Sequence, residues 1–303
     1  MYELNQVGEQ SYYINCPAKI GIYKANETDV YLIDSGNDKD AGRKIRKILD
    51  ENGWVLKGII NTHSNADHIG GNKYLQQQTG CKIFVNKIEG AFTQYPILEP
   101  SFLYGGFPCK DLRHKFLMAK ESDTVELTDP DFPAELEVID LKGHFFDMIG
   151  ICTPDNTVFL ADCISSKMTL DKYQISFIYD VEEYFKTLDK VEQIEADMFV
   201  PAHADASGDV KELVQYNRAK VFEIISQIKE FLSEPMCFEA LLKKLFDKYN
   251  LVMNFEQYVL VGSTVRSYLS YLKDKGEISA DFKDNQLIWK VKLKTRECVL
   301  SGF

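Results

Sequence analysis

The stretch that most constrains the fold of this chain is NTHSNADHIGGN, at positions 61–72. His63, Asp67 and His68 crowd two imidazoles and a carboxylate into this one segment, which is the chemistry of a metal site. An apolar run at 55–60, typical of a buried strand, comes directly before it. Asn65 stands where a third imidazole would be expected. A chain with this loop must fold so that further ligands, distant in sequence, come close to it.

Short β-branched and aromatic runs alternate with amphipathic segments in the first part of the chain, which predicts an α+β fold. The expected strands lie at 11–17, 19–25, 30–34, 55–61, 81–86, 135–141, 148–154, 157–162 and 197–202. The expected helices lie at 40–52, 68–78, 181–194 and 210–232.

Further candidate ligands stand at the ends of these expected strands. His144 follows the strand at 135–141, Asp162 closes the strand at 157–162, and His203 follows the strand at 197–202. A strand end on a rigid scaffold is where functional side chains are commonly held. Of the five histidines, His114 alone stands apart from this pattern.

A length of 303 residues favours two domains, and the SEP stretch at 233–235 is a plausible boundary between residues 1–232 and 233–303. The second part predicts a helix, a long helix and a hairpin around the KDN turn, an order that resembles a winged helix. One face of the long helix is apolar at positions 261, 265, 268, 269 and 272, so we expect that face to be buried.

Charge and cysteine content exclude several classes of protein. A net charge of −11 disfavours nucleic acid and anionic membrane as partners. The seven cysteines are never spaced as CxxC, which indicates reduced, buried thiols such as Cys163. With no apolar run long enough to span a membrane, the composition predicts a cytoplasmic protein.

Residues 92–122 break the periodic pattern, being rich in aromatic residues, proline and glycine. This segment could form a lid over a pocket or a packed surface insertion. Tyr104 within it, and Phe145 beside His144, are candidate pocket residues. His114 would reach the metal site if the segment folded over that site, although a surface position suits it better.

The order LIDSG, THSNADHIGG, GH, LAD and PAH resembles the metallo-β-lactamase superfamily over roughly residues 8–206. The resemblance implies a four-layer αβ/βα sandwich with its metal site at the mouth between two sheets. It places His63, Asn65 and His144 on one metal and Asp67, His68 and His203 on the other, with Asp162 bridging the two. It also implies that Asp34 holds the metal ligands in place without being a metal ligand itself. The aromatic residues of GHFFDM depart from the family's usual GHTPG turn.

Asn65 leaves the metal content open. A carboxamide oxygen is a poorer zinc ligand than an imidazole and suits magnesium or manganese better. Three alternatives follow: two metals with a weakened site, one metal at either site, or a protein that only binds. His63, His144 and Asp162 also have the composition of a facial triad, and persulfide dioxygenases, which resemble this superfamily, hold a single iron at these positions.

These features predict a hydrolase with one or two Zn²⁺, or else Fe or Mn, in which Asp67 and Asp162 support attack by a metal-bound hydroxide. The expected substrate is a small ester, thioester, lactone or amide. The alternatives are a metal-dependent ribonuclease or phosphodiesterase, an iron oxygenase of the persulfide dioxygenase type, and a protein that binds a ligand without catalysing a reaction. The C-terminal part is expected to pack on the catalytic part, to shape the pocket or to form a homodimer contact.

Overall fold

The computed structural model describes residues 2–292, and the strands in that range form three sheets. The first sheet has the order β1-β2-β3-β4-β5-β6-β7, the second β11-β10-β9-β8 and the third β12-β14-β13. The strands of the first sheet are β1 (Glu3–Gln6), β2 (Ser11–Asn15), β3 (Ile20–Lys24), β4 (Asp29–Ile33), β5 (Val55–Ile60), β6 (Lys82–Val85) and β7 (Val125–Glu126). Those of the second are β8 (Glu137–Asp140), β9 (Ile149–Cys152), β10 (Thr157–Ser165) and β11 (Met198–His203).

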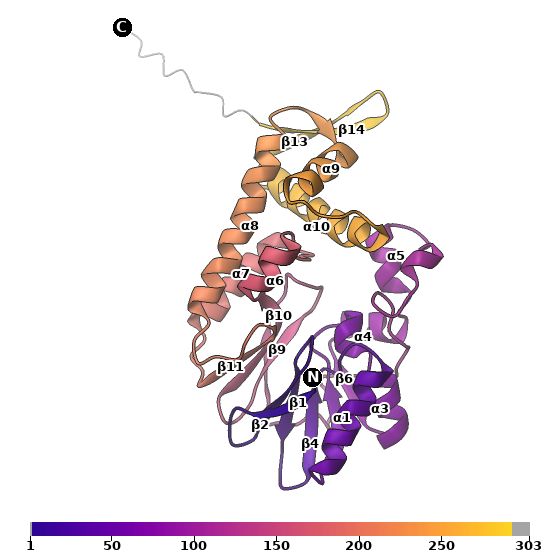
Figure 1. The fold of residues 1–303 in the computed structure, drawn as a ribbon, viewed down its shortest axis with the longest axis vertical. Coiled ribbons are helices and arrows are strands. Elements are labelled where there is room, and N and C mark those ends of the chain that lie inside the picture. Colours follow the sequence, from indigo (N-terminus) through magenta and orange to yellow (C-terminus); the bar gives the residue numbers. More distant parts are fainter. Residues whose placement is uncertain (1, 293–303) are drawn as a thin grey trace.

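Helices cover the outer faces of the first two sheets, whereas the last two helices lie beyond these sheets, beside the third sheet (Figure 1). Those of the first half are α1 (Lys39–Glu51), α2 (Ala66–Ile69), α3 (Asn72–Thr79), α4 (Lys87–Gln94), α5 (Leu98–Tyr104) and the 3₁₀ turn η1 (Lys110–Leu112). Those of the second half are α6 (Lys167–Tyr173), α7 (Val181–Gln193), α8 (Lys211–Phe231), α9 (Phe238–Lys248) and α10 (Phe255–Asp274). The strands expected from the sequence are present, and β1, β7 and a short strand at Met236–Cys237 are additions to them.

Alternating side chains of the strands build two different cores, as the period of a strand requires. In β4, Val30 and Leu32 pack with Ile45 and Leu49 of α1. Its neighbour Ile33 instead points toward the second sheet, in a cluster that also contains Phe159 of β10. The first sheet is thus covered by helices on one face and by the second sheet on the other.

The outer face of the second sheet is covered by α7 and α8. Val158 and Leu160 of β10 share a buried cluster with Leu188 of α7 and Ile224 of α8. The layers therefore run helix, sheet, sheet, helix, which confirms the four-layer sandwich expected from the sequence.

The helix expected at 68–78 is wrong in one respect, because it is divided into α2 and α3. The Gly70 amide donates to the Gly36 carbonyl at 2.7 Å. A Cβ on Gly70 would lie 2.2 Å from the backbone carbon of Asn37, and one on Gly71 would lie 2.3 Å from the Ser35 carbonyl oxygen. Two glycines let the chain pass this close to the loop after β4, and that approach interrupts the helix.

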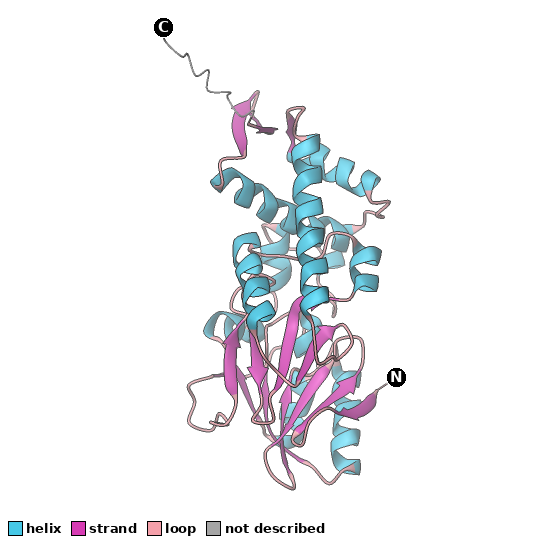
Figure 2. Cartoon of the chain, turned by 90° about the vertical axis from the view of Figure 1, so that its left-hand side faces the viewer, coloured by secondary structure: helices cyan, strands magenta, loops and turns pink. Residues whose placement is uncertain are grey.

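The C-terminal elements contain the two helices and the hairpin expected from the sequence. The hairpin joins β13 (Ile278–Lys283) and β14 (Gln286–Val291) through Asp284 and Asn285, both with positive φ, and the short β12 (Met236–Cys237) pairs with β14. The expected apolar face of α10 is buried. Figure 2 shows the large sheets in the lower half of the molecule and the third sheet beyond the helices at the top.

Residues 92–122 form a packed insertion that includes α5 and η1. Leu103, Leu112 and Leu117 are buried in one cluster with Val259 of α10. The insertion therefore links the sandwich to the C-terminal helices through a small apolar core. This packing favours a packed surface insertion over a lid, the two alternatives that the sequence left open.

Candidate metal centre

The first half of the site is the loop after β5. Ile59 and Ile60, at the carboxyl end of β5, are buried on opposite faces of the first sheet, and the loop starts directly after them. The Asn72 side chain then donates to the Asn61 side chain at 2.7 Å and ties the loop to α3. Both His63 and His68 are fully buried, so their rings are fixed by packing.

Asp34 lies directly behind this loop, where the sequence placed it. Its backbone is left-handed, with a φ of 66°. The carboxylate accepts from the backbone amide of Thr62 at 2.8 Å and from the Thr62 hydroxyl at 2.7 Å. It also lies 2.8 Å from Nδ1 of His68. One buried carboxylate therefore holds the loop and one ring of the site together.

The second half of the site comes from the second sheet. His144 lies in the loop between β8 and β9, and His203 ends β11. Asp162 does not end its strand, as the sequence suggested, because β10 continues to Ser165. The ladder between β10 and β11 is instead irregular on either side of Ala161, which has a φ of 49°. Such an irregularity redirects a side chain, here that of Asp162.

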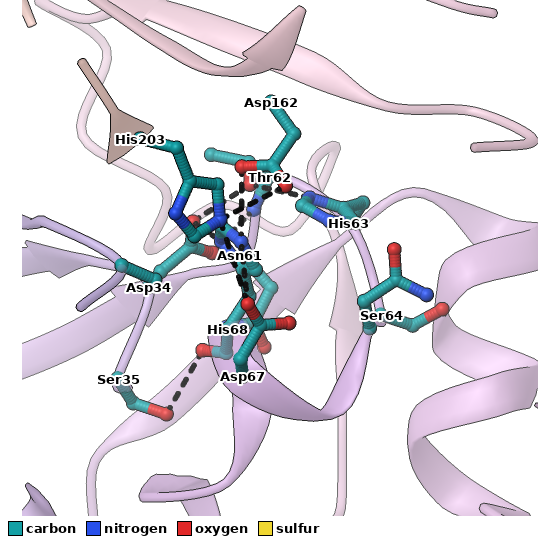
Figure 3. A network of polar contacts seen from close by, with 12 residues as sticks. Asp34, Ser35, Asn61, Thr62, His63, Ser64, Asp67, His68, Asp162 and His203 are labelled. Atoms are coloured by element: carbon teal, nitrogen blue, oxygen red, sulfur yellow. Dashed lines mark hydrogen bonds and ion pairs between the residues drawn. The ribbon is translucent and has the colours of Figure 1, made fainter. Parts of the chain in front are cut away.

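Figure 3 shows Asp162 and His203 facing the loop that carries His63, Asp67 and His68. Oδ1 of Asp162 lies 3.1 Å from Nε2 of His68, and Oδ2 lies 3.2 Å from Nε2 of His203 and 3.6 Å from Nε2 of His144. Oδ2 of Asp67 lies 3.5 Å from Nε2 of His203. Asp162 is thus central, in the position expected of a bridging ligand.

These side chains fall into two groups, and in each group the potential ligand atoms lie within 4.8 Å of one another. One group is His63, His144 and Asp162, and the other is Asp67, His68 and His203. Among histidine and acidic side chains, these are the sets that the family resemblance implies.

The outward ring nitrogens of the histidines are turned toward acceptors. Nδ1 of His144 lies 3.0 Å from the Phe177 carbonyl, and Nδ1 of His203 lies 3.0 Å from the Pro17 carbonyl. Nδ1 of His63 lies 3.0 Å from the Thr62 hydroxyl, whose hydrogen is donated to Asp34. Since carbonyls and carboxylates only accept from N–H groups, the proton of each neutral ring is on Nδ1 and the lone pair is on Nε2.

The Nε2 atoms therefore point their lone pairs into one space, beside the carboxylates. Within residues 2–292, Nε2 of His63 and His68 and Oδ1 of Asp162 are buried without a well-formed hydrogen bond. Buried polar atoms are rarely left in this state without a reason. A bound cation would satisfy these lone pairs together, so the residues fit a metal centre.

Burial and neighbouring charge separate the pKa values of these rings. Burial, assisted by the nearby His68 charge, holds the pKa of His63 well below its usual value, and burial also lowers that of His144. The Asp162 carboxylate raises the pKa of His203 to about 10 despite burial. Burial opposes a charge on His68, but Asp162 and Asp67 outweigh it and raise the pKa of that ring. The carboxylates thus favour positive charge here, in the form of protons on His68 and His203 that a bound divalent cation would displace.

Asn65, at the N-terminus of α2, also lies in the site. Its Oδ1 is 3.1 Å from Nε2 of His144, and its Nδ2 donates to Oε1 of Glu99 at 2.8 Å. Glu99 is 5% exposed, and burial raises its pKa well above the usual value.

Glu89 is a second buried carboxylate next to the loop. It accepts from the Ser64 backbone amide and hydroxyl at 2.9 and 2.6 Å, and from the Asp147 amide at 2.8 Å. Burial raises its pKa to about 7. Sequence reasoning missed both Glu89 and Glu99, and the signal that could have found them is a single acid within a mostly apolar stretch.

Four other residues considered from the sequence lie outside the centre. Nε2 of His114 is 2.9 Å from Glu256 of α10. Cys163 is a fully buried core residue, and burial raises its pKa. The prediction that Phe145 lines a pocket is wrong, because this ring is fully buried among other aromatic rings, with its centroid 6.2 Å from that of His63. Tyr104 lines a cavity of about 700 Å³ between α5, α7 and α10, and none of the candidate ligands is among the described residues that line it.

A search of the helices within residues 2–292 finds none that is long and apolar enough to cross a membrane.

Comparison with known proteins gives a match to the metallo-beta-lactamase superfamily over residues 15–203. A hydroxyacylglutathione hydrolase of Rhodopseudomonas palustris is 28% identical over 130 residues, which cover 43% of this chain and 42% of that protein. The chain thus matches about two fifths of the length of this relative.

Two solved structures share the fold over nearly the whole chain. A beta-lactamase domain protein from Burkholderia ambifaria aligns with a TM-score of 0.72 and 13% identity, covering 96% of this chain and 94% of the other. A metallo-beta-lactamase family protein from Thermus thermophilus aligns with a TM-score of 0.70 and 16% identity, covering 96% and 98%. These alignments include the C-terminal elements, so the fold is shared beyond the sandwich.

Proposed function

Because the chain belongs to the metallo-β-lactamase superfamily, we propose that it is a metal-dependent hydrolase acting on a small ester, thioester, lactone or amide. The observation that carries this proposal is the convergence of four Nε2 atoms and two carboxylates on one space between the sheets. His63, Asn65 and His144 would hold one cation, and Asp67, His68 and His203 the other. Asp162 would contact both.

Bound there, divalent cations would lower the pKa of a water molecule and polarise the oxygen of the group under attack. The chain's own residues supply orientation. Asp34 holds the His68 ring, the Thr62 hydroxyl lies against Nδ1 of the His63 ring, and the Phe177 carbonyl holds the His144 ring. Asp67 is the most exposed carboxylate of the site, with 44% of its side chain accessible, so it is placed to accept a hydrogen bond from an attacking water.

A thioester is the substrate class that we favour. The relative from Rhodopseudomonas palustris is named a hydroxyacylglutathione hydrolase, as is one from Hyphomonas neptunium that is 32% identical over 112 residues. Zinc is the metal that we expect first, since each group offers two imidazoles and a carboxylate. The carboxamide of Asn65 also suits magnesium or manganese.

One observation favours a second candidate function. His63, His144 and Asp162 form a compact group of two imidazoles and one carboxylate, which is the composition of a facial triad for non-haem iron. An iron oxygenase would use this group alone. Stoichiometric iron and oxygen consumption would identify it, whereas zinc with thioester cleavage would identify the hydrolase.

The nuclease alternative has less support. The net charge of −11 opposes binding to a polyanion. The long helix α10, which would be available to a nucleic acid in a free winged helix, packs against α5 and α7. We therefore propose that the C-terminal elements support the catalytic part.

The test is elemental analysis of the untagged full chain, together with hydrolysis of a panel of glutathione thioesters, lactones and a phosphodiester. We expect zinc at one or two equivalents, thioester cleavage that chelation abolishes, and recovery on adding zinc back. Thioester cleavage that persists without metal, or a chain that takes up no metal, would contradict the proposal.

A further inference from the structure

The contacts of Asn65 fix which way its amide points. Nδ2 donates to Oε1 of Glu99 at 2.8 Å, an oxygen that accepts whether or not the other oxygen of the group carries a proton. Oδ1 is therefore turned away from Glu99 and toward Nε2 of His144, 3.1 Å away. The side chain that replaces the expected imidazole is thus oriented by a residue 34 positions further along the chain.

This orientation brings two lone pairs face to face. Nδ1 of His144 lies 3.0 Å from the Phe177 carbonyl, so it carries the proton and Nε2 of the neutral ring is an acceptor. Oδ1 of Asn65 is an acceptor as well. Two acceptors at hydrogen-bond distance repel each other unless a cation lies where both can reach it. The reversed amide would form an ordinary hydrogen bond to His144, but it would set its oxygen against the Glu99 carboxylate.

We propose that Glu99 is a positioning residue that aims Oδ1 of Asn65 at the cation held by His63, His144 and Asp162. This inference rests on the proposed function, since it assigns a role within the same metal centre. The Asn65–Glu99 pair takes the place of an imidazole: the carboxamide supplies the ligand atom, and the carboxylate supplies its direction.

The surroundings of Glu99 suit this role. The residue is 5% exposed and lies in the first turn of α5, whose Leu103 is buried against Val259 of α10. A side chain on a packed helix can hold a neighbour in one orientation, as outer partners of metal ligands generally do.

The experiment measures zinc binding, not catalysis. Zinc affinity is determined by chelator competition, and zinc content by elemental analysis, on the full chain. At saturating zinc we expect wild type to hold two equivalents, whether it is purified with one or with two. Glu99→Ala should weaken one of them by about 10- to 100-fold, the effect typical of losing an outer partner of a metal ligand. Asn65→Ala should weaken the same equivalent, and the double variant Asn65→Ala/Glu99→Ala should lose little more.

Two further variants separate orientation from general damage. Asn65→His/Glu99→Ala should regain wild-type affinity, because an imidazole does not need an amide partner to direct it. Glu89→Gln is the matched control, since Glu89 is equally buried but contacts Ser64 and Asp147, which are not candidate ligands. It should keep both equivalents.

Three results would overturn the inference while leaving the proposed function intact: wild-type affinity in Glu99→Ala, an equal loss in the Asn65→Ala background, or an equal loss in Glu89→Gln. Wild type without bound zinc or other metal would overturn the proposed function itself, and the inference with it.

Discussion

Two residues with left-handed backbone lie at the metal centre. Asp34 has a φ of 66° and Ala161 a φ of 49°, a region that costs a residue with a side chain about 1–3 kcal/mol. Asp34 holds Thr62 and His68, and Ala161 immediately precedes Asp162. The strain therefore falls at two positions that aim functional groups, and the surrounding core sustains it.

The shared position of Asp162 leads to the first prediction. Asp162→Ala should reduce bound zinc to near zero, because this carboxylate contacts rings of both ligand groups. The rate of thioester cleavage should fall by more than the about 10- to 100-fold that is typical when a hydrogen-bond partner of a metal ligand is removed. Zinc content and turnover of the variant test this, with circular dichroism to show that the fold is kept.

His68→Ala should cost nearly as much, because we expect the essential metal at Asp67, His68 and His203, the group that does not include Asn65. If His68→Ala keeps metal and activity while His63→Ala abolishes both, the essential metal lies at His63, His144 and Asp162 instead.

Buried Glu89 gives a prediction about pH. Its pKa is raised from 4.5 to about 7, so the folded chain holds this proton more tightly than the unfolded chain. The stabilisation is complete below pH 4.5 and is lost as pH rises toward 7, by roughly 3 kcal/mol in the limit of the full shift. Urea unfolding of wild type and Glu89→Gln at pH 5 and pH 8 measures it. The stability advantage of wild type should shrink at pH 8, and an equal difference at both pH values would contradict the assignment.

At the scale of elements, α10 reaches the metal centre through residues 177–179. The Ser267 hydroxyl donates to the Tyr179 carbonyl at 2.7 Å, and the Ile178 amide donates to the Thr264 hydroxyl at 3.3 Å. The same segment offers the Phe177 carbonyl to Nδ1 of His144. A helix of the C-terminal part therefore fixes the strip of backbone that orients one candidate ligand.

Ser267→Ala tests this connection. We expect a loss of about 1 kcal/mol in the free energy of unfolding, the usual value of one hydrogen bond. Zinc affinity should fall by less than the about 10- to 100-fold seen for direct partners of a metal ligand, because Ser267 acts on His144 only through residues 177–179. Ser270→Ala is the control, since Ser270 is exposed on the same helix. Equal zinc affinity in the two variants would show that α10 does not act on the centre.

At the scale of the whole molecule, the sandwich and the C-terminal part share one core. Tyr184 and Leu188 of α7 belong to the same buried cluster as Leu241 of α9 and Leu269 of α10. The long helix α8 contributes Ile224 and Ile228 to it. Residues before and after the expected boundary at residue 232 therefore belong to the same apolar core.

Removing residues 233–303 should leave a chain that does not fold stably. Each large apolar side chain uncovered costs about 1.5–3 kcal/mol, and a domain has only about 5–15 kcal/mol of net stability. Size-exclusion chromatography and near-ultraviolet circular dichroism of residues 1–232, beside the full chain, provide the measurement. A monomeric truncated chain with native-like spectra would support the two-domain division and contradict our view of a shared core.

The sequence by itself determined most of the strands and helices and nearly all the candidate ligands, whereas the layers followed from its resemblance to the metallo-β-lactamase superfamily. Strand period, helix period and the place of histidine and aspartate at strand ends are local properties, so they can be read along the chain. The ordering of His63, His68, His144, Asp162 and His203 was enough to predict that these residues meet.

Tertiary structure alone decided the features that depend on distant approach. Gly70 and Gly71 divide a helix because the loop after β4 passes against them. Phe145 is buried because other aromatic rings surround it. Asn65 and Glu99 lie 34 residues apart, a distance that no helical or strand repeat predicts. The role of either residue is visible only when the other is seen beside it. Such contacts arise from how packed elements meet in space, which no local pattern of residues encodes.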